Sequence, residues 1–327
     1  MNSLLKVNDL KVHYLLANSV VRAVDGVTFD LKENEIFSLV GESGSGKSTL
    51  AYAIARLLDS SYVRIYGEII FNGINLLELS EIEMEKIRGN LISMIPQDPS
   101  AALNPAYTVG EQIAEVLRYK KGLTHKEARD LSIELMKKVG IPDAEKRYLD
   151  YPHQLSGGMN QRVVIAIAMA LRPKLIIADE PTSALDVTVQ ARILELLMGL
   201  VKEYGSTMLL ITHDLGVAAE VSDRIGVMYA GKLMEIGSKE EILEKPLHPY
   251  TQALLHVVPR FHKKKRRLKP IAGMVPNLSS PPSGCRFHPR CPYRSKECVL
   301  QEPLMVEVEP GHWVSCNLYA MEASYHA

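Results

Sequence analysis

The chain has 327 residues, of which 46% are apolar, so it can bury a sizeable core as one large domain, alone or with an appendage. Its 38 basic and 38 acidic residues balance, which excludes a general affinity for nucleic acid or for an acidic membrane surface. The longest apolar stretch, Val163 to Leu171, falls short of the about 20 residues that span a bilayer, and the N-terminus lacks the pattern of a signal peptide, so we expect a cytoplasmic protein.

Strands are predicted at the start of the chain. Residues 1–40 alternate apolar and polar positions, which is typical of antiparallel strands, and residues 35–40 form a short buried strand. A glycine-rich turn follows, with a helix from about Lys47. Residues 66–75 predict a hairpin that turns at Asn72-Gly73.

Helices then alternate with buried strands. Helices are predicted over residues 111–118 and 125–139 and from about Gly158, and buried strands over residues 175–178 and 208–211. This alternation indicates a mostly parallel sheet at the core. From Ser238 onward the pattern of apolar residues weakens and prolines become frequent. We therefore expect an irregular C-terminal appendage that needs a cross-link, such as a metal centre, to stabilise it.

The glycine-rich turn carries a phosphate-binding pattern. Gly41-Glu42-Ser43-Gly44-Ser45-Gly46-Lys47-Ser48 matches GxxxxGK[ST] in full, between a buried strand and a helix. The glycines let successive N–H groups point at a β-phosphate, and the helix N-terminus adds partial positive charge. Lys47 is expected to reach the β- and γ-phosphates and Ser48 to ligate Mg²⁺, with Thr49 as a further nucleotide contact.

Two acids complete this ATP site. The apolar strand 175–178 ends in Asp179, which can hold Mg²⁺ through water, and Glu180 follows as the expected general base for an attacking water. By themselves they would equally suit a strand that ends before a turn at Pro181. The phosphate-binding pattern upstream favours the catalytic interpretation.

A third motif indicates the family. Leu155-Ser156-Gly157-Gly158-Met159-Asn160-Gln161-Arg162 resembles the LSGGQ-type signature of ABC ATPases. A capped helix N-terminus with exposed N–H groups can face a phosphate, and in the family Ser156, Gly157, Gly158 and Met159 would face the γ-phosphate held by the opposite subunit.

Further residues match the family at similar spacing. Gln97 resembles the Q-loop glutamine, which contacts Mg²⁺ or water. The run 183–186 resembles the D-loop at the dimer interface, and His213 resembles the switch histidine that contacts the γ-phosphate. Tyr14 resembles the aromatic residue that stacks on adenine, although a strand residue packed in the sheet is the alternative for it.

The resemblance implies an α/β fold: a P-loop NTPase of ABC type with a RecA-like mixed core sheet, an antiparallel β-subdomain, a helical subdomain over residues 98–170 and an irregular Cys-rich appendage. The ATPase domain would cover residues 1–237 and the extension residues 238–327. Met159, the run His248-Pro249-Tyr250-Thr251 and the tail 284–292 resemble the ATPases of oligopeptide and dipeptide importers. Some members of that branch carry oligosaccharides, and a soluble ABC-type ATPase of DNA repair or translation is a further alternative.

The resemblance also implies partners. Two ATPase subunits would enclose ATP between them on the cytoplasmic face of the membrane, under two membrane permease subunits. The second ATPase would be a sister subunit, with a homodimer still open, and an extracellular solute-binding protein would belong to the same system. No nucleic-acid partner is expected.

All four cysteines, Cys285, Cys291, Cys298 and Cys316, lie in the last 43 residues. In a reducing compartment such a cluster favours a metal centre over disulfides. The spacing lacks the paired CxxC of typical zinc ribbons, whereas four thiolates suit a [4Fe–4S] cluster, as in related dipeptide-transporter ATPases. Zinc, with His288 or His312 as stand-in ligands, and a metal-free segment are the alternatives.

Overall fold

The computed structural model describes residues 3–183, 185–257 and 271–319. These residues form two compact units, one built from residues 1–79 and 210–327 and the other from residues 80–209. Strand β8 (Thr207–Thr212) crosses the boundary between the two along the chain. The basic run Lys263–Arg267, for which the sequence predicts a solvated linker, lies outside the described residues.

An antiparallel sheet forms the start of the first unit. Its strand order is β2-β1-β4-β5, and Val12 of β1 lies opposite Val24 of β2, both fully buried. The predicted hairpin turn is confirmed, because Asn72 and Gly73 both take positive φ (52° and 83°), as a tight two-residue hairpin turn requires. The strands are β1 (Ser3–Leu16), β2 (Ser19–Lys32), β4 (Val63–Phe71) and β5 (Ile74–Asn75).

A second, mixed sheet of the same unit holds the phosphate-binding turn. Within this unit its strands follow the order β11-β12-β10-β9-β3, in which β3 and β9 are parallel and the other neighbours antiparallel. They are β3 (Ile36–Val40), β9 (Arg224–Tyr229), β10 (Lys232–Ser238), β11 (Met305–Glu309) and β12 (His312–Ser315). Its helices are α1 (Lys47–Ile54), α9 (Leu215–Val221), α10 (Lys239–Glu244), α11 (Pro249–Val257) and α12 (Lys296–Leu300), with short 3₁₀ turns at Leu76–Glu78 and His288–Arg290.

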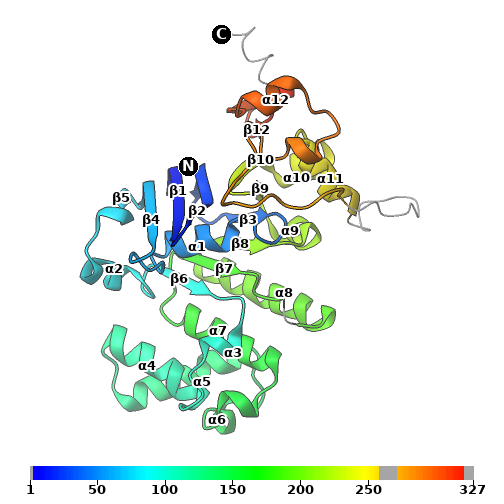
Figure 1. Ribbon diagram of the computed structural model, residues 1–327. Helices are drawn as coiled ribbons and strands as arrows, with labels where there is room; N and C mark the ends of the chain where they lie inside the picture. Colours follow the sequence, from blue (N-terminus) through cyan, green and yellow to red (C-terminus); the bar gives the residue numbers. More distant parts are fainter. Residues whose placement is uncertain (1–2, 184, 258–270, 320–327) are drawn as a thin grey trace. The chain divides into compact units, whose positions relative to one another are not determined.

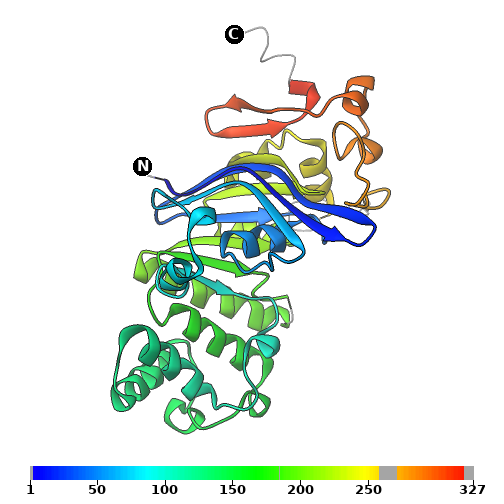
Figure 2. The ribbon, with the colours of Figure 1, turned by 60° about the vertical axis from the view of Figure 1, so that its left-hand side comes forward.

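The expected irregularity of the C-terminal segment is only partly right. The segment carries three helices, and Figure 2 shows its red β11–β12 hairpin, in which Glu235 and Ile236 of β10 pair with Val314 and Trp313 of β12. Phe287 and Val314 are almost fully buried. Burial of apolar side chains therefore stabilises this segment, which the density of prolines had argued against.

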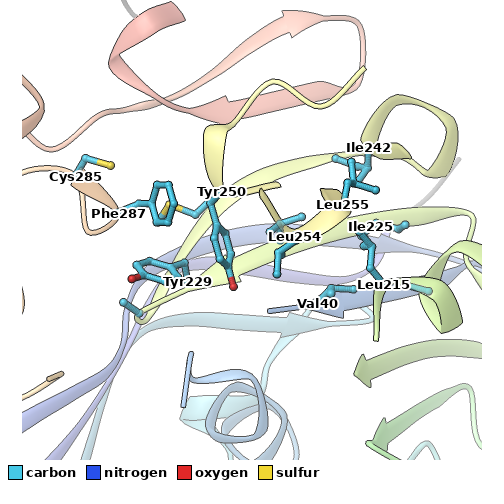
Figure 3. Close-up of a cluster of buried hydrophobic side chains, with 14 of the residues drawn as sticks. Val40, Leu215, Ile225, Tyr229, Ile242, Tyr250, Leu254, Leu255, Cys285 and Phe287 are labelled. Carbon is cyan, nitrogen blue, oxygen red and sulfur yellow. The ribbon is translucent and has the colours of Figure 1, made fainter. Parts of the chain in front are cut away.

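The buried cluster drawn in Figure 3 joins the C-terminal segment to the core of the unit. Tyr229 at the end of β9, Tyr250 of α11 and Phe287 are almost completely buried, and their ring centroids lie 4.6–5.3 Å apart. Cys285 and Cys298 belong to the same cluster. Aromatic rings at such separations contribute more than their buried area alone.

The second unit combines two parallel strands with a group of helices. Strands β6 (Ile92–Ile95) and β7 (Leu175–Asp179) pair in parallel. Thr108 and Thr124 cap the helices α4 and α5 through their side chains, and Gly122 ends α4 with a φ of 68°. Figure 1 labels the helices α2 (Glu81–Ile87), α3 (Pro99–Ala102), α4 (Val109–Lys121), α5 (His125–Lys138), α6 (Ala144–Arg147), α7 (Gly157–Met169) and α8 (Val187–Tyr204); a 3₁₀ turn lies at Pro152–Gln154.

The helices predicted over residues 111–118, 125–139 and from Gly158 are confirmed within a few residues as α4, α5 and α7. The buried strands predicted over residues 175–178 and 208–211 are β7 and β8. Among the helices that the structure describes, none is long and apolar enough to cross a membrane.

Candidate functional site

The phosphate-binding loop runs from the end of β3 to the start of α1, and two of its glycines are required sterically. A Cβ on Gly41 would lie 2.0 Å from the carbonyl oxygen of Met228. A Cβ on Gly46, whose φ is 101°, would lie 2.1 Å from the carbonyl oxygen of Ala23. The loop therefore runs against two neighbouring strands, where a larger residue would clash.

Lys47 folds back over the loop that precedes it. Its Nζ donates to the carbonyl oxygens of Gly41 and Glu42 at 2.8 and 3.0 Å and to Ser45 Oγ at 3.3 Å. Gly46 caps α1 without a side-chain hydrogen bond. A cationic amine over a loop that ends at a helix N-terminus forms a strong binding site for the phosphates of a nucleotide.

Tyr14 lies beside this loop. Its hydroxyl is 3.3 Å from Thr49 Oγ1 in the first turn of α1, and its ring stacks on that of Tyr62 at 6.3 Å between centroids. The side chain of Tyr14 is half-buried, and Tyr62 is 48% exposed. An aromatic pair next to a phosphate-binding loop suits the planar base of a nucleotide. The sequence did not indicate a role for Tyr62, which lies just before β4 and belongs to none of the recognised motifs.

The second unit brings Gln97 and Glu180 together. Gln97 follows β6, and its Nε2 donates to Glu180 Oε2 at 3.2 Å. Asp179 ends the fully buried strand β7 and is itself 2% exposed. Glu180 takes a φ of 45°, which is rare for a residue with a side chain and is typical of positions held by their surroundings at functional sites.

The signature motif starts α7. Ser156 is the N-cap and its hydroxyl accepts from the backbone N–H of Met159 at 3.3 Å. Ser156 and Gly157 are exposed, and a Cβ on Gly158 would lie 2.9 Å from Val189 Cγ1. The motif therefore presents an open, capped helix N-terminus that can meet an anion.

The D-loop run 183–186 and His213 are the remaining matches. Asp186 caps α8 by accepting from the N–H groups of Thr188 and Val189 at 3.1 and 3.0 Å, while Ala184 lies outside the described residues. His213 is exposed at the end of β8, next to Asp214, which caps α9. The first unit thus holds Tyr14, the loop and His213, and the second holds Gln97, Asp179, Glu180 and residues 156–159.

Two residues of the C-terminal segment contact the phosphate-binding loop, and neither was predicted as a site residue. Tyr250 Oη accepts from the backbone N–H of Glu42 at 2.9 Å. Arg290 donates to both carboxylate oxygens of Glu42 at 2.6 and 3.1 Å. These residues are more than 200 positions from Glu42 along the chain, so only their places in the run 248–251 and beside Cys291 could have drawn attention to them.

The four cysteine thiols lie in one region of the first unit. Burial raises the pKa of Cys316 to about 12, and the charges of Cys285, Cys291 and Cys298 add to that shift. Burial likewise raises the pKa of Cys285 to about 11, opposed by the backbone N–H groups of Phe287 and His288. Cys285 and Cys298 belong to the buried cluster, Cys291 packs against it and Cys316 is also buried, so water is largely excluded around these thiols.

The donor set does not suit a single metal ion. Within the described ranges, no three His, Cys, Asp or Glu side chains converge as they would around one ion. His312 is engaged elsewhere, because its Nε2 lies 2.8 Å from the buried carboxylate of Glu235, and His288 Nδ1 lies 3.0 Å from the carbonyl oxygen of Cys285. The zinc alternative with these histidines as stand-in ligands therefore lacks structural support. A [4Fe–4S] cluster is larger than one ion, so thiolates that bind it stand farther apart.

Comparison with known proteins matches both parts of the chain to families. Residues 24–183 match the ABC transporter family, and residues 234–298 match the oligopeptide/dipeptide transporter C-terminal region. The oligopeptide transport ATP-binding protein AppD of Bacillus subtilis is 46% identical over 99% of each chain. The dipeptide transport ATP-binding protein DppD of Escherichia coli is 45% identical over 96% of each chain.

Solved structures show the same fold. The ATP-binding cassette MJ0796, solved as a dimer in a post-hydrolysis state bound to ADP and Pi, superposes with a TM-score of 0.65 at 32% identity, covering 72% of this chain and 98% of its own. CbiO1 of Clostridium perfringens, part of the transporter complex cbiONQ, gives a TM-score of 0.62 at 28% identity over 75% and 93%. With its phosphate-binding loop, its signature helix and these relatives, the chain is an ATPase of the ABC transporter family, in the branch of the oligopeptide and dipeptide transport ATP-binding proteins.

Proposed function

We propose that this chain is the ATP-hydrolysing subunit of an importer of oligopeptides or dipeptides, and that the residues described above bind ATP and hydrolyse it. The observation that carries the proposal is the loop from Gly41 to Ser48, in which a side chain at Gly41 or Gly46 would clash and Lys47 donates to the loop's own carbonyl oxygens. The relatives named for peptide transport support the choice of solute.

Residues of the first unit hold the nucleotide. The adenine stacks on Tyr14, and the loop N–H groups of Ser43, Gly44, Ser45 and Gly46 surround the β-phosphate. Lys47 gives up its hydrogen bonds to the carbonyl oxygens of the loop and binds the β- and γ-phosphates instead. Ser48 would ligate Mg²⁺, which when bound would supply positive charge at the phosphoryl oxygens, and His213 would contact the γ-phosphate.

Residues of the second unit act on the attacking water. Glu180 polarises the water as general base, and Gln97, hydrogen-bonded to Glu180, orients both. Asp179, at the end of β7, would help to hold Mg²⁺.

The site is completed by a second ATPase subunit. The capped N-terminus of α7, with Ser156, Gly157, Gly158 and Met159, faces the γ-phosphate bound by the partner, and the D-loop crosses the interface. Each ATP is therefore enclosed by two subunits, and closure of the pair acts on the membrane subunits. The dimeric cassette MJ0796 supports this arrangement.

Glu180→Gln tests the assignment of the general base. The amide cannot take a proton from water, so steady-state ATP hydrolysis should fall by about 100-fold or more while MgATP still binds. The measurement is phosphate release together with retained radiolabelled ATP. Glu195→Gln, a change at an exposed position of α8, is the control and should hydrolyse at the normal rate. Turnover of Glu180→Gln within a few-fold of that control would remove Glu180 from its role.

The partners and place of the subunit follow the same proposal. Two membrane permeases, a sister ATPase and an extracellular solute-binding protein make up the system, and the chain sits on the cytoplasmic face of the membrane. The ATPase domain covers residues 1–237, and residues 238–327 form the extension. Purification of the chain from its native membrane should bring down two permeases and a second ATPase. Recovery of the chain with another copy of itself would instead indicate a homodimer.

Cys285, Cys291, Cys298 and Cys316 are the proposed ligands of a [4Fe–4S] cluster. Their mutual effect on pKa, and the N–H groups that approach the sulfurs of Cys285 and Cys316, support it, because hydrogen bonds to sulfur are typical of such sites. The raised pKa values mean that the thiols must lose protons when metal binds. Anaerobically prepared protein should contain iron and acid-labile sulfide in equal amounts, and Cys298→Ser should lose both. Absence of iron and sulfide from the wild-type protein would disprove the cluster.

A further inference from the structure

The C-terminal segment reaches the phosphate-binding loop at one residue, Glu42. The backbone N–H of Glu42 donates to Tyr250 Oη at 2.9 Å, and its carboxylate accepts two hydrogen bonds from Arg290 at 2.6 and 3.1 Å. Main chain and side chain of the second residue of the loop are thus both bonded from outside the ATPase core. Two parallel N–H···O bonds between a guanidinium and a carboxylate fix direction as well as distance.

Arg290 is firmly held at its own end. Its side chain is 4% exposed, and it also donates to the carbonyl oxygens of Ala272 and Ile271 at 2.9 and 3.3 Å and to Tyr229 Oη at 3.2 Å. Burial lowers the pKa of Arg290, but the hydrogen bonds to Glu42 and Tyr229 outweigh it and the pKa is raised overall. This ion pair is therefore unlike an exposed one, which contributes little because both partners are mobile and solvated.

Tyr250 is held in the same way by packing. It is fully buried, and its ring lies against those of Tyr229 and Phe287 at 4.6 and 5.2 Å. Figure 3 shows the three rings together, with Cys285 beside Phe287. Burial raises the pKa of Tyr250, so its hydroxyl stays neutral and accepts the hydrogen bond from the loop.

The loop is otherwise anchored to strands of its own core. Gly41 packs on the carbonyl oxygen of Met228 and Gly46 on that of Ala23, and the N–H of Gly231 donates to the carbonyl oxygen of Ser45 at 2.9 Å. Gly44, whose φ is 77°, has open space where a Cβ would be. Within the loop, the carbonyl oxygen of Glu42 accepts from Lys47 Nζ and from the N–H of Ser45, while its N–H and carboxylate are held by Tyr250 and Arg290.

We infer that Arg290 and Tyr250 are positioning residues for ATP binding, which hold Glu42 so that the loop N–H groups stay directed at the phosphates. The C-terminal segment then supports the nucleotide site through its contacts with Glu42. Arg290 is bonded directly to Cys291, so a change in the state of the cysteine region reaches the loop through one peptide unit and one ion pair. This inference rests on the proposed assignment of the loop as the ATP site.

The experiment measures the Kd of MgATP for the full-length chain by calorimetry and the KM and kcat of hydrolysis. Arg290→Gln should weaken binding by about 10-fold, which corresponds to about 1.4 kcal/mol, because Glu42 loses both charge-assisted hydrogen bonds from the guanidinium. Glu42→Gln should have a similar effect. The double variant Arg290→Gln/Glu42→Gln should bind MgATP no more weakly than either single variant, since both changes remove the same ion pair. Arg290→Lys should restore part of the affinity, because one ammonium keeps the charge but not both hydrogen bonds.

Controls separate this role from simple support of the fold. Arg294→Gln, at an exposed position in the same segment, should bind MgATP as the wild type does. Tyr250→Phe removes only the hydroxyl and should raise KM with kcat changed less than about twofold, a split that a general loss of folded protein would not produce. Normal Kd in both Arg290→Gln and Tyr250→Phe, or additive losses in the double variant, would overturn the inference. Lys47→Ala tests the site itself, because normal binding of MgATP by that variant would show that the proposed ATP site is wrong. If Lys47→Ala loses binding while the Arg290 and Tyr250 variants bind normally, the ATP site stands and only the roles of Arg290 and Tyr250 are refuted.

Discussion

At the scale of the residue, the sequence predicted the motif residues of the proposed ATP site, but it did not predict the contacts that hold the phosphate-binding loop in place. The loop 41–48 and the pair Asp179-Glu180 are contiguous in sequence, and their spacing is imposed by what a phosphate or a metal needs. The contacts of Glu42 with Tyr250 and Arg290 join residues far apart in the chain, so no local pattern indicated them. The positive φ of Glu180 was equally hidden, because backbone strain leaves no signature in residue type.

His248 gives a pH-dependent prediction at this scale. Burial lowers its pKa from 6.5 to about 3, and its Nδ1 accepts from the N–H of Tyr250 at 3.0 Å. The unfolded chain takes up a proton below pH 6.5 and the folded chain does not, so this group lowers the free energy of unfolding as pH falls from 6.5 towards 3. The loss should approach about 1.4 kcal/mol per pH unit.

His248→Asn should flatten that dependence, since an amide oxygen can still accept from Tyr250 but does not titrate. Urea unfolding at pH 7, 6 and 5 would measure it. The matched change His153→Asn, at an exposed histidine, should leave the slope as in the wild type. An unchanged slope in His248→Asn would contradict the buried, neutral state assigned to this histidine.

At the scale of the element, the strands and helices of the ATPase core were predicted well because each carries its own period. The C-terminal segment was not, because its order comes from contacts distant in sequence. The hairpin β11–β12 joins β10 through β12, and Phe287 enters a cluster with Tyr229 and Tyr250. The prolines correctly indicate that the connections within this segment are irregular, but they do not indicate which of its side chains are buried.

Phe287→Ala tests whether burial stabilises the C-terminal segment. Phe287 is 1% exposed, and its removal leaves a cavity beside the buried rings of Tyr229 and Tyr250, so the free energy of unfolding should fall by about 3 kcal/mol. Tyr293→Ala, at a position that is 58% exposed in the same segment, should change it by less than about 0.5 kcal/mol. Chemical denaturation of both variants would measure the difference. Equal stability of the two would show that the segment is held chiefly by its cysteines and not by its core.

At the scale of the whole molecule, the family followed from motifs that each serve one step of ATP hydrolysis, and the comparisons confirm it. The solute is a different matter, because the motifs recognised in the sequence bind ATP and none of them indicates which solute is carried. The sequence indicates only the branch, through the C-terminal region that matches the oligopeptide/dipeptide transporter family over residues 234–298. By the inference above, this region also supports the nucleotide site through Glu42.

The most direct test of the central claim is uptake of peptide by cells that carry the chain with and without a working loop. Lys47→Ala removes the ammonium that would bind the phosphates, so uptake of a radiolabelled dipeptide and a radiolabelled pentapeptide should fall to background for at least one of them. Uptake of a labelled disaccharide should stay normal, and Arg294→Gln should transport like the wild type. Undiminished uptake of both peptides by cells whose only copy is Lys47→Ala would contradict the claim that this chain powers peptide import.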